Sequence, residues 1–298
     1  MPPPLSYPAL KCVLDFLDPA RRIHIAARSP SLQRIEKPIP LVFDSHHVCY
    51  GDVILNSTLI QFGPCGQLQF CSKGEIHKSY KPGSLSGTKA LTRMLENYFG
   101  DRPIIRVNKV YFDHIMEYID RTTGFTYTVN EIDSRCPDFA HVLPFINPDS
   151  FPLKKLATSV NEPEQLKYPA IRFANKLKMR FIQDCDTLQV IDIDKLCNKS
   201  VFFDFKKEEL VDVMALIRYW IDNGRELEST FIFPFQREKG ALVGLFDAEF
   251  GEFKNTDISN NRYSIPIRGS KSIHVTVDKY TGDTDFKSTA TLKIVSSL

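Results

Sequence analysis

The side chains that could do chemistry include a histidine pair, His46-His47, close to Cys49. Histidine nitrogens and cysteine thiolates are ligands that zinc prefers in proteins. However, the surrounding residues predict a β-strand, in which successive side chains point to opposite faces, so His46 and His47 cannot converge on one ion. We therefore expect either surface histidines or core histidines with hydrogen-bond partners.

Two further groups have the residue types of a metal site without its spacing. Cys65 and Cys71 lie near His77, yet a zinc site needs a second ligand pair to match the first, and the sequence has none. Asp283-Thr284-Asp285 lacks the inner glycine and the last glutamate of a calcium loop. We expect ordinary thiols in the first case and a hairpin turn in the second.

The motifs of the commonest enzyme classes are missing from the sequence. It contains no Gly-rich phosphate loop, no His-Glu-x-x-His and no Gly-x-Ser-x-Gly. His114 and Glu117 would share one helix face, but without a nucleophile or a metal they predict a solvated pair. The sequence therefore predicts no catalytic residue, no cofactor and no metal. A deep pocket with converging titratable groups would instead favour an enzymatic function.

Composition and charge exclude several classes of protein. A chain of 298 residues with 43% hydrophobic content can bury a large core, so we expect one large domain and a small appendage. The 38 basic and 36 acidic residues leave a formal charge of +2, which offers little attraction for phosphates. We expect no nucleic-acid partner.

The amino terminus and the cysteines predict a soluble intracellular protein, cytoplasmic or nuclear. Met1-Pro2-Pro3-Pro4 has no basic start, and no stretch approaches the roughly 20 apolar residues that cross a bilayer. We therefore expect no membrane interaction. The seven cysteines are odd in number and show no framework spacing, which predicts reduced thiols.

Three short helices with two abrupt corners are predicted at the start of the chain. Proline suits the first turn of a helix, and it occurs at Pro8, Pro19 and Pro30. Pro19 and Pro30 each follow a residue that can cap a helix start, Asp18 and Ser29. The apolar residues at helical spacing are Leu10, Val13, Leu14 and Leu17, then Ile23, Ala26 and Ala27, then Leu32 and Ile35. So short a unit cannot bury all of them, and must pack against a larger domain, a partner or both.

Strands, one loop and one clear helix are predicted next. Residues 41–70 contain β-branched runs that favour two or three strands, and residues 71–85 are rich in Gly, Pro and Ser, as is typical of a surface loop. Apolar residues from Ala90 to Tyr98 predict a helix that Gly100 ends.

From residue 110 onward, short apolar strands recur at a nearly constant period. Their first residues are Val110, Ile132, Leu156, Leu177, Val201 and Phe231, at spacings of 22, 24, 21, 24 and 30. Leucine-rich repeats run at roughly 20 to 29 residues per strand and crossover, and only the last spacing falls outside that range. The pattern predicts a curved, mainly parallel sheet that is leucine-rich-repeat-like, although the usual asparagine ladder is missing.

Crossover helices and a β-rich end complete the prediction. The predicted helical faces are Phe139 to Ile146, Leu188 with Ile191, and Lys206 to Asn223, where Trp220 is a core residue and Gly224 the stop. The predicted C-terminal strands are 241–246, 263–267, 272–277 and 289–295. We expect an α/β fold in two parts, a helical unit over 1–40 and an irregular β/α domain over 41–298 with antiparallel strands at its end.

The run from Leu5 to Leu32 resembles an F-box. The corner Phe16-Leu17-Asp18-Pro19 is similar to that family's leucine-aspartate-proline corner, whereas the opening proline is delayed to Pro8 and no tryptophan follows the third helix. Three more segments resemble the nematode-expanded F-box-like proteins of unknown function: Glu36 to Leu41, Ile146 to Leu153, and Trp220-Ile221 with Arg225-Glu226.

This resemblance implies a substrate receptor of a Skp-cullin-F-box ubiquitin ligase, with no catalytic residues of its own. Its partners would be a Skp-type adaptor with the cullin complex, and an unknown protein substrate. The partner-binding residues would be Leu5, Pro8, Leu14, Leu17, Pro19 and Ile23. The alternative is a repeat scaffold that binds protein partners without a ligase role, its first helices serving only as a cap.

Overall fold

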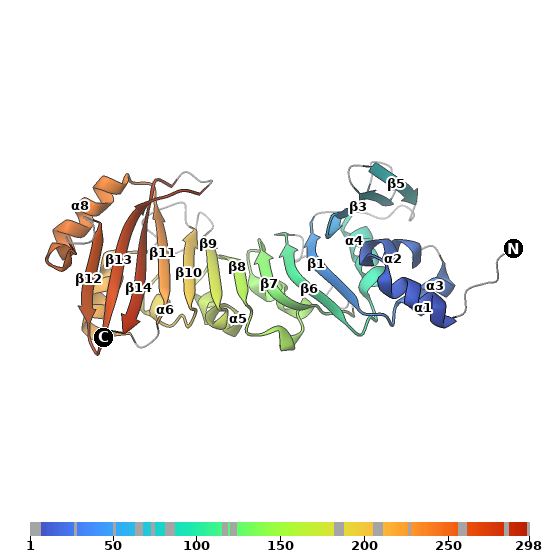
Figure 1. Ribbon diagram of the computed structural model, residues 1–298, viewed down its shortest axis with the longest axis horizontal. Coiled ribbons are helices and arrows are strands. Elements are labelled where there is room, and N and C mark those ends of the chain that lie inside the picture. The colour runs from blue at the N-terminus through green and yellow to red at the C-terminus, as the bar shows by residue number, and fades with distance from the viewer. Residues whose placement is uncertain are drawn as a thin grey trace. The chain divides into compact units, whose positions relative to one another are not determined.

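The computed structural model (Figure 1) has a mixed α/β fold with three helices at its amino-terminal end and antiparallel strands near its carboxyl-terminal end. It describes residues 7–26, 29–49, 52–62, 68–72, 75–80, 87–114, 119, 124–181, 188–204, 211–225, 228–255, 261–282 and 286–296. The chain divides into two compact units, Met1–Phe151 and Pro152–Leu298. That residues 1–40 form a domain of their own stays a prediction.

The first unit joins helices to a mixed sheet. Its helices are α1 (Tyr7–Phe16), α2 (Pro19–Ala26), α3 (Pro30–Glu36) and α4 (Gly87–Phe99), followed by the 3-10 helices η2 (Phe139–His141), η3 (Leu143–Phe145) and η4 (Pro148–Ser150). Its strands are β1 (Leu41–Val48), β2 (Asp52–Leu55), β3 (Thr58–Phe62), β4 (Leu68–Ser72), β5 (Glu75–Tyr80), β6 (Ile105–Phe112) and β7 (Thr128–Ser134). The order β7-β6-β1-β2-β3-β4-β5 is parallel from β7 to β1 and antiparallel beyond.

The parallel strands β1, β6 and β7 share an interruption of their alternation. A regular strand buries every second residue. In β1 the buried residues are Leu41, Phe43, His46 and Val48, so one step spans three positions. The buried residues of β6 follow the same spacing, and they align with those of β1 and β7 in rows. In one such row His46, Val110 and Ile132 are neighbours.

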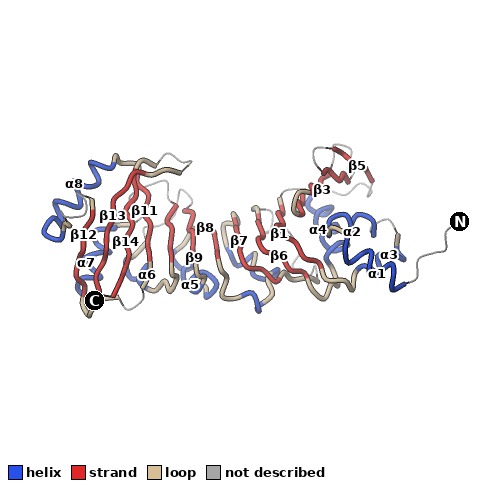
Figure 2. Tube along the Cα trace, in the orientation of Figure 1, coloured by secondary structure: helices blue, strands red, loops and turns tan. Residues whose placement is uncertain are grey.

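The second unit has parallel strands flanked by an antiparallel group. Its helices are η5 (Pro163–Lys167), α5 (Pro169–Phe173), α6 (Val190–Asp194), α7 (Val213–Asn223), α8 (Lys239–Phe250) and η7 (Gly251–Phe253). Its strands are β8 (Lys155–Val160), β9 (Lys176–Phe181), β10 (Ser200–Asp204), β11 (Thr230–Phe235), β12 (Arg262–Ile267), β13 (Lys271–Lys279) and β14 (Ser288–Ser296). The order is β12-β13-β14-β11-β10-β9-β8, in which β8 to β11 are parallel and the rest antiparallel (Figure 1). Figure 2 shows the strands of this unit in red and its helices in blue.

Helix α7 is fixed by Trp220 and by the residues that follow its end. Trp220 is fully buried, and its indole N–H donates to Asp194 Oδ1 at 2.9 Å. Gly224 ends the helix with φ +76°, and a Cβ there would lie 2.7 Å from the carbonyl oxygen of Arg268. Buried Arg225 donates to Asp194, Leu196 O and Ser229 Oγ. These bonds tie α6 and α7 to the start of β11.

Most predicted elements are confirmed. The recurrent strands all form, as β6 to β11, and so do the helices of the first forty residues and the helix that ends at Gly100. The strand predicted over 241–246 is wrong, because these residues lie in α8. The loop predicted over 71–85 is wrong for residues 71–72, which end β4, and for residues 75–80, which form β5. The face from Phe139 to Ile146 forms short 3-10 turns, and residues 205–210 lie outside the described residues.

Candidate partner-binding surface

The two corners of the helical unit are set by side-chain caps. Asp18 Oδ1 accepts from the backbone N–H groups of Ala20 and Arg21, at 3.0 and 3.2 Å. Ser29 Oγ accepts from Leu32 N at 3.4 Å, with proline at the next position. Such caps satisfy backbone donors that a helix start leaves without partners. They fix where α2 and α3 begin, as the sequence predicts.

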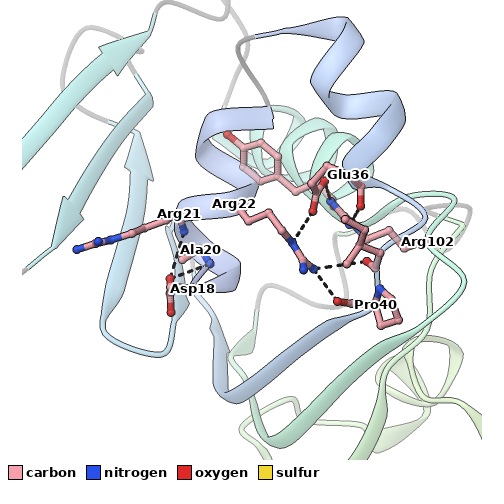
Figure 3. Close-up of polar contacts among 9 residues, drawn as sticks. Asp18, Ala20, Arg21, Arg22, Glu36, Pro40 and Arg102 are labelled. Atoms are coloured by element: carbon pink, nitrogen blue, oxygen red, sulfur yellow. Dashed lines mark hydrogen bonds and ion pairs between the residues drawn. The ribbon is translucent and has the colours of Figure 1, made fainter. Parts of the chain in front are cut away.

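A buried charge network joins these helices to the rest of the first unit (Figure 3). Glu36, at the end of α3, is fully buried; Arg22 Nε donates to its Oε1 at 3.0 Å, and Arg102 Nη2 donates to its Oε2. Arg22 also donates to the carbonyl oxygen of Pro40 at 2.6 Å, and Arg102 to that of Tyr98 at 2.5 Å. Desolvation lowers the pKa of Arg22, and the Glu36 carboxylate opposes that effect.

Helix α1 has apolar residues on two sides, and the described residues cover only one of them. Leu14 is 2% exposed and belongs to the core. Val13 is 47% exposed and Phe16 is 87% exposed, while Leu10 and Leu17 are half-buried. We name Val13 and Phe16, with Leu10 and Leu17 at the border, the α1 face. Phe16 is the most exposed large apolar side chain of the described residues.

The predicted partner-binding residues differ in where they lie. Leu14 and Ile23 are interior, Leu17 and Pro19 are half-buried, and Pro8 is exposed. Leu5 lies outside the described residues. Sequence reasoning missed Val13 and Phe16 as surface residues, although Val13 stood in the apolar stripe and Phe16 in the corner motif. An aromatic residue next to a predicted helix end was the signal that could have found Phe16.

The histidine pair is split between the two faces of β1, as the sequence predicts. His47 is half-buried, with its ring 5.2 Å from that of Tyr111. His46 is fully buried among aromatic rings, 5.1 Å from Phe99 and 5.2 Å from Tyr127. Among the described residues, neither His46 ring nitrogen nor the Tyr127 hydroxyl has a hydrogen-bond partner. The predicted core histidine with hydrogen-bond partners is therefore wrong for His46.

Burial changes the proton affinity of both groups. Desolvation lowers the pKa of His46 from 6.5 to about 3, with a smaller contribution from the charge of His47. Desolvation also raises the pKa of Tyr127 well above its usual value. Both groups are therefore neutral near pH 7.

The described residues contain no group of three or more His, Cys, Asp or Glu side chains that could hold a metal ion. Cys65, Glu117, residues 283–285 and the His77 side chain lie outside the description, and His114 is exposed. The described cysteines, Cys12, Cys49, Cys71, Cys136 and Cys197, form no disulfide with one another. No helix in the described part of the chain is long and apolar enough to cross a membrane.

Comparison with known proteins gives one match. The family described as a domain of unknown function (DUF3557) matches residues 87–237, just over half of the chain. The match runs from the start of α4 to just beyond β11, so it does not include the α1 face. No curated protein and no solved structure matches the chain significantly.

Proposed function

The chain belongs to the family of that domain of unknown function (DUF3557), and we propose that it acts as a non-catalytic F-box-type adaptor. In this proposal the α1 face docks a Skp-type subunit of a cullin complex, and the sheets hold a protein substrate. The chain itself makes and breaks no bond. It acts in the cytoplasm or the nucleus.

One observation carries the proposal, the exposure of Phe16 and Val13 at the corner that resembles an F-box. Exposed aromatic and aliphatic side chains that lie together mark protein interaction sites, whereas single ones are common on any surface. On α1 the two belong to one helix of ten residues and are bordered by half-buried Leu10 and Leu17. A groove on a partner could bury this helix face, as helix-in-groove recognition requires.

We also propose that the β/α strands form a leucine-rich-repeat-like curved sheet. Parallel strands β8 to β11 and the buried loop residue Asn198 support it. The Asn198 amide donates to the carbonyl oxygens of Ile171 and Ala174, the latter at 2.5 Å, and so links one strand connection to the preceding one. This bridge supports the proposal at one place, between the connection before β9 and the connection before β10.

The test is co-purification of the full chain with a Skp-type subunit. Phe16→Asp places a charge where the proposal needs an apolar contact, so it should abolish co-purification while leaving the thermal unfolding midpoint within a few degrees of the wild type. Phe173→Asp is the matched control, because Phe173 is a 51% exposed phenylalanine on α5, a helix of the other unit. Retained binding by Phe16→Asp, or no binding by the wild type, contradicts the proposal.

The scaffold alternative is favoured by a different observation. The network of Arg22, Glu36 and Arg102 builds α2 and α3 into the first unit, which is what a cap would do. Deleting residues 1–38 would leave buried Arg102 without its carboxylate, so the deletion should destabilise the remainder under either proposal. The surface variant Phe16→Asp separates the two, because a cap does not depend on an exposed side chain.

A further inference from the structure

The sheet of the second unit has one face that its own described residues leave partly open. In β9, β10 and β11 the buried residues Leu177, Val201 and Phe231 point to one side. The alternate residues, such as Phe202 and Ile232, are only half-buried. Parallel strands normally have both faces covered, so an open face on parallel strands needs an explanation.

A row of basic and hydroxyl side chains crosses this open face. Strand pairing aligns Lys155, Lys176, Ser200, Thr230, Lys293 and His274, one from each neighbouring strand. We name them the lysine row. The three lysines and His274 are exposed, and the row contains no carboxylate. Lys155 and Lys176 are direct neighbours across β8 and β9, a like-charge pairing that is destabilising.

The acidic groups near the row are already engaged. Lys178, two residues after Lys176, pairs with Asp204 at 2.8 Å. Glu228 hydrogen-bonds Ser296 at 2.7 Å. Among the ion pairs of the described residues, none includes Lys155, Lys176 or Lys293. The Ser296 hydrogen bond lowers the pKa of Glu228 most, and Glu228 also lies close enough to Lys293 for that lysine's charge to lower this pKa further. The lysines of the row therefore form no ion pair among the described residues, and Lys155 and Lys176 present positive charge.

Beside the row lies a small apolar area. Phe202 and Ile232 are neighbours across β10 and β11, and the Lys178 ammonium lies 5.2 Å from the Phe202 ring centre. Phe202 lies two residues beyond Ser200 in β10, and Ile232 lies two residues beyond Thr230 in β11. Each of these pairs is about 7 Å apart along its strand. A ligand on the lysine row can therefore also contact apolar surface.

We propose that this open face binds an extended acidic segment of a protein partner, with its carboxylates on the lysine row and an apolar side chain on Phe202 and Ile232. The proposal rests on the adaptor function, for which it names the substrate class. Lys176 and Lys293 are three strand spacings apart, about 14 Å. An extended chain covers that distance in about four residues. The segment should therefore have acidic residues about four positions apart.

The experiment measures binding of the full chain to a fluorescent peptide by anisotropy. The peptide has two pairs of glutamates about four residues apart with leucine between them, and the control peptide has glutamine in place of glutamate. The wild type should bind the acidic peptide with an affinity that falls as the salt concentration rises, and it should not bind the glutamine peptide. Lys155→Glu, Lys176→Glu and Lys293→Glu combined should weaken binding about tenfold or more.

The matched control is Lys167→Glu with Lys195→Glu, which reverses two exposed charges of the same unit that are not part of the row. It should leave the affinity within about twofold. Equal binding of both peptides, no binding by the wild type, or no effect of the triple variant overturns the proposal. Tighter binding of single-stranded DNA than of the acidic peptide also overturns it, since the row would then be a nucleic-acid site.

The two proposals fail separately. Phe16→Asp should not change the affinity for the acidic peptide, and the triple lysine variant should still co-purify with a Skp-type subunit. Loss of peptide binding alone therefore removes the substrate class, whereas loss of co-purification alone removes the adaptor function.

Discussion

Arg22 and Arg102 bind the two different oxygens of one carboxylate, that of Glu36, although they are 80 residues apart in the sequence. All three side chains are buried. Among the described residues, neither arginine forms an ion pair with any other acidic group. The carboxylate therefore links the end of α3 to the segment that follows α4.

Glu36→Gln should therefore destabilise the protein strongly. The amide keeps the shape but leaves two buried guanidinium groups without a counter-charge, which costs about 3 to 5 kcal/mol. Urea unfolding measures the loss. The control Glu164→Gln removes an exposed pair with Lys167 and should cost less than about 1 kcal/mol. Similar values for the two variants would contradict the buried network.

Leu14 and Phe16 lie two residues apart on α1, and truncating them to alanine should change stability by very different amounts. Leu14→Ala opens a space in the core and should cost about 2 to 5 kcal/mol. Phe16→Ala removes an exposed ring and should change the free energy of unfolding by less than about 0.5 kcal/mol. Chemical denaturation of both variants checks the orientation of α1. A larger loss for Phe16→Ala would mean that this ring is buried.

His46 should make the protein sensitive to acid. Its pKa is about 3 in the folded state against 6.5 for a free side chain, so the unfolded chain binds more protons between these values and stability falls as the pH falls through this window. From pH 7 to about pH 5 the loss from this group is about 2 kcal/mol.

His46→Ile should remove that loss. Val110 and Ile132 occupy the same row, so an apolar residue fits there, and stability at pH 7 should stay equal or rise. Urea midpoints of both proteins at pH 7 and about pH 5 measure the effect, since the contribution of other groups is common to both. An equal fall in stability between the two pH values for both proteins would show that protonation of His46 does not destabilise the folded state.

Arg225→Lys should destabilise the second unit by about 2 to 3 kcal/mol. The guanidinium donates to three residues and lies against the rings of Trp220 and Phe231, and an ammonium group cannot reproduce that geometry. Thermal unfolding checks the loss against Arg218→Lys, in which an exposed arginine paired with Glu249 is changed. An equal effect of the two changes would argue against the buried role of Arg225.

Local signals predicted the helix starts and most strands, because Asp18 and Ser29 act on donors within three residues of them. The helix α8 was missed, because the run from Ala241 to Phe246 has no polar residue to reveal a period. Only Leu242, Phe246 and Phe250 of α8 are buried, and Leu245 is 41% exposed. Burial depends on what packs against the helix, and a single sequence does not contain that.

The sequence predicted the apolar helix α1 but not its orientation. Apolar residues cover two sides of α1, and helical spacing alone does not tell which side meets the core. The partners of Glu36 were also beyond reach, since Arg102 is separated from it by 66 residues. The lysine row depends on strand order, because Lys176 and Lys293 come together only when β14 joins β11.

The shared three-position step in β1, β6 and β7 limits how this part of the protein can change in length. One residue added to or removed from a single strand would set its step out of line with its neighbours and turn its remaining side chains to the wrong side. Length variation among relatives should therefore fall in the connections between these strands, and the strands themselves should keep a constant size.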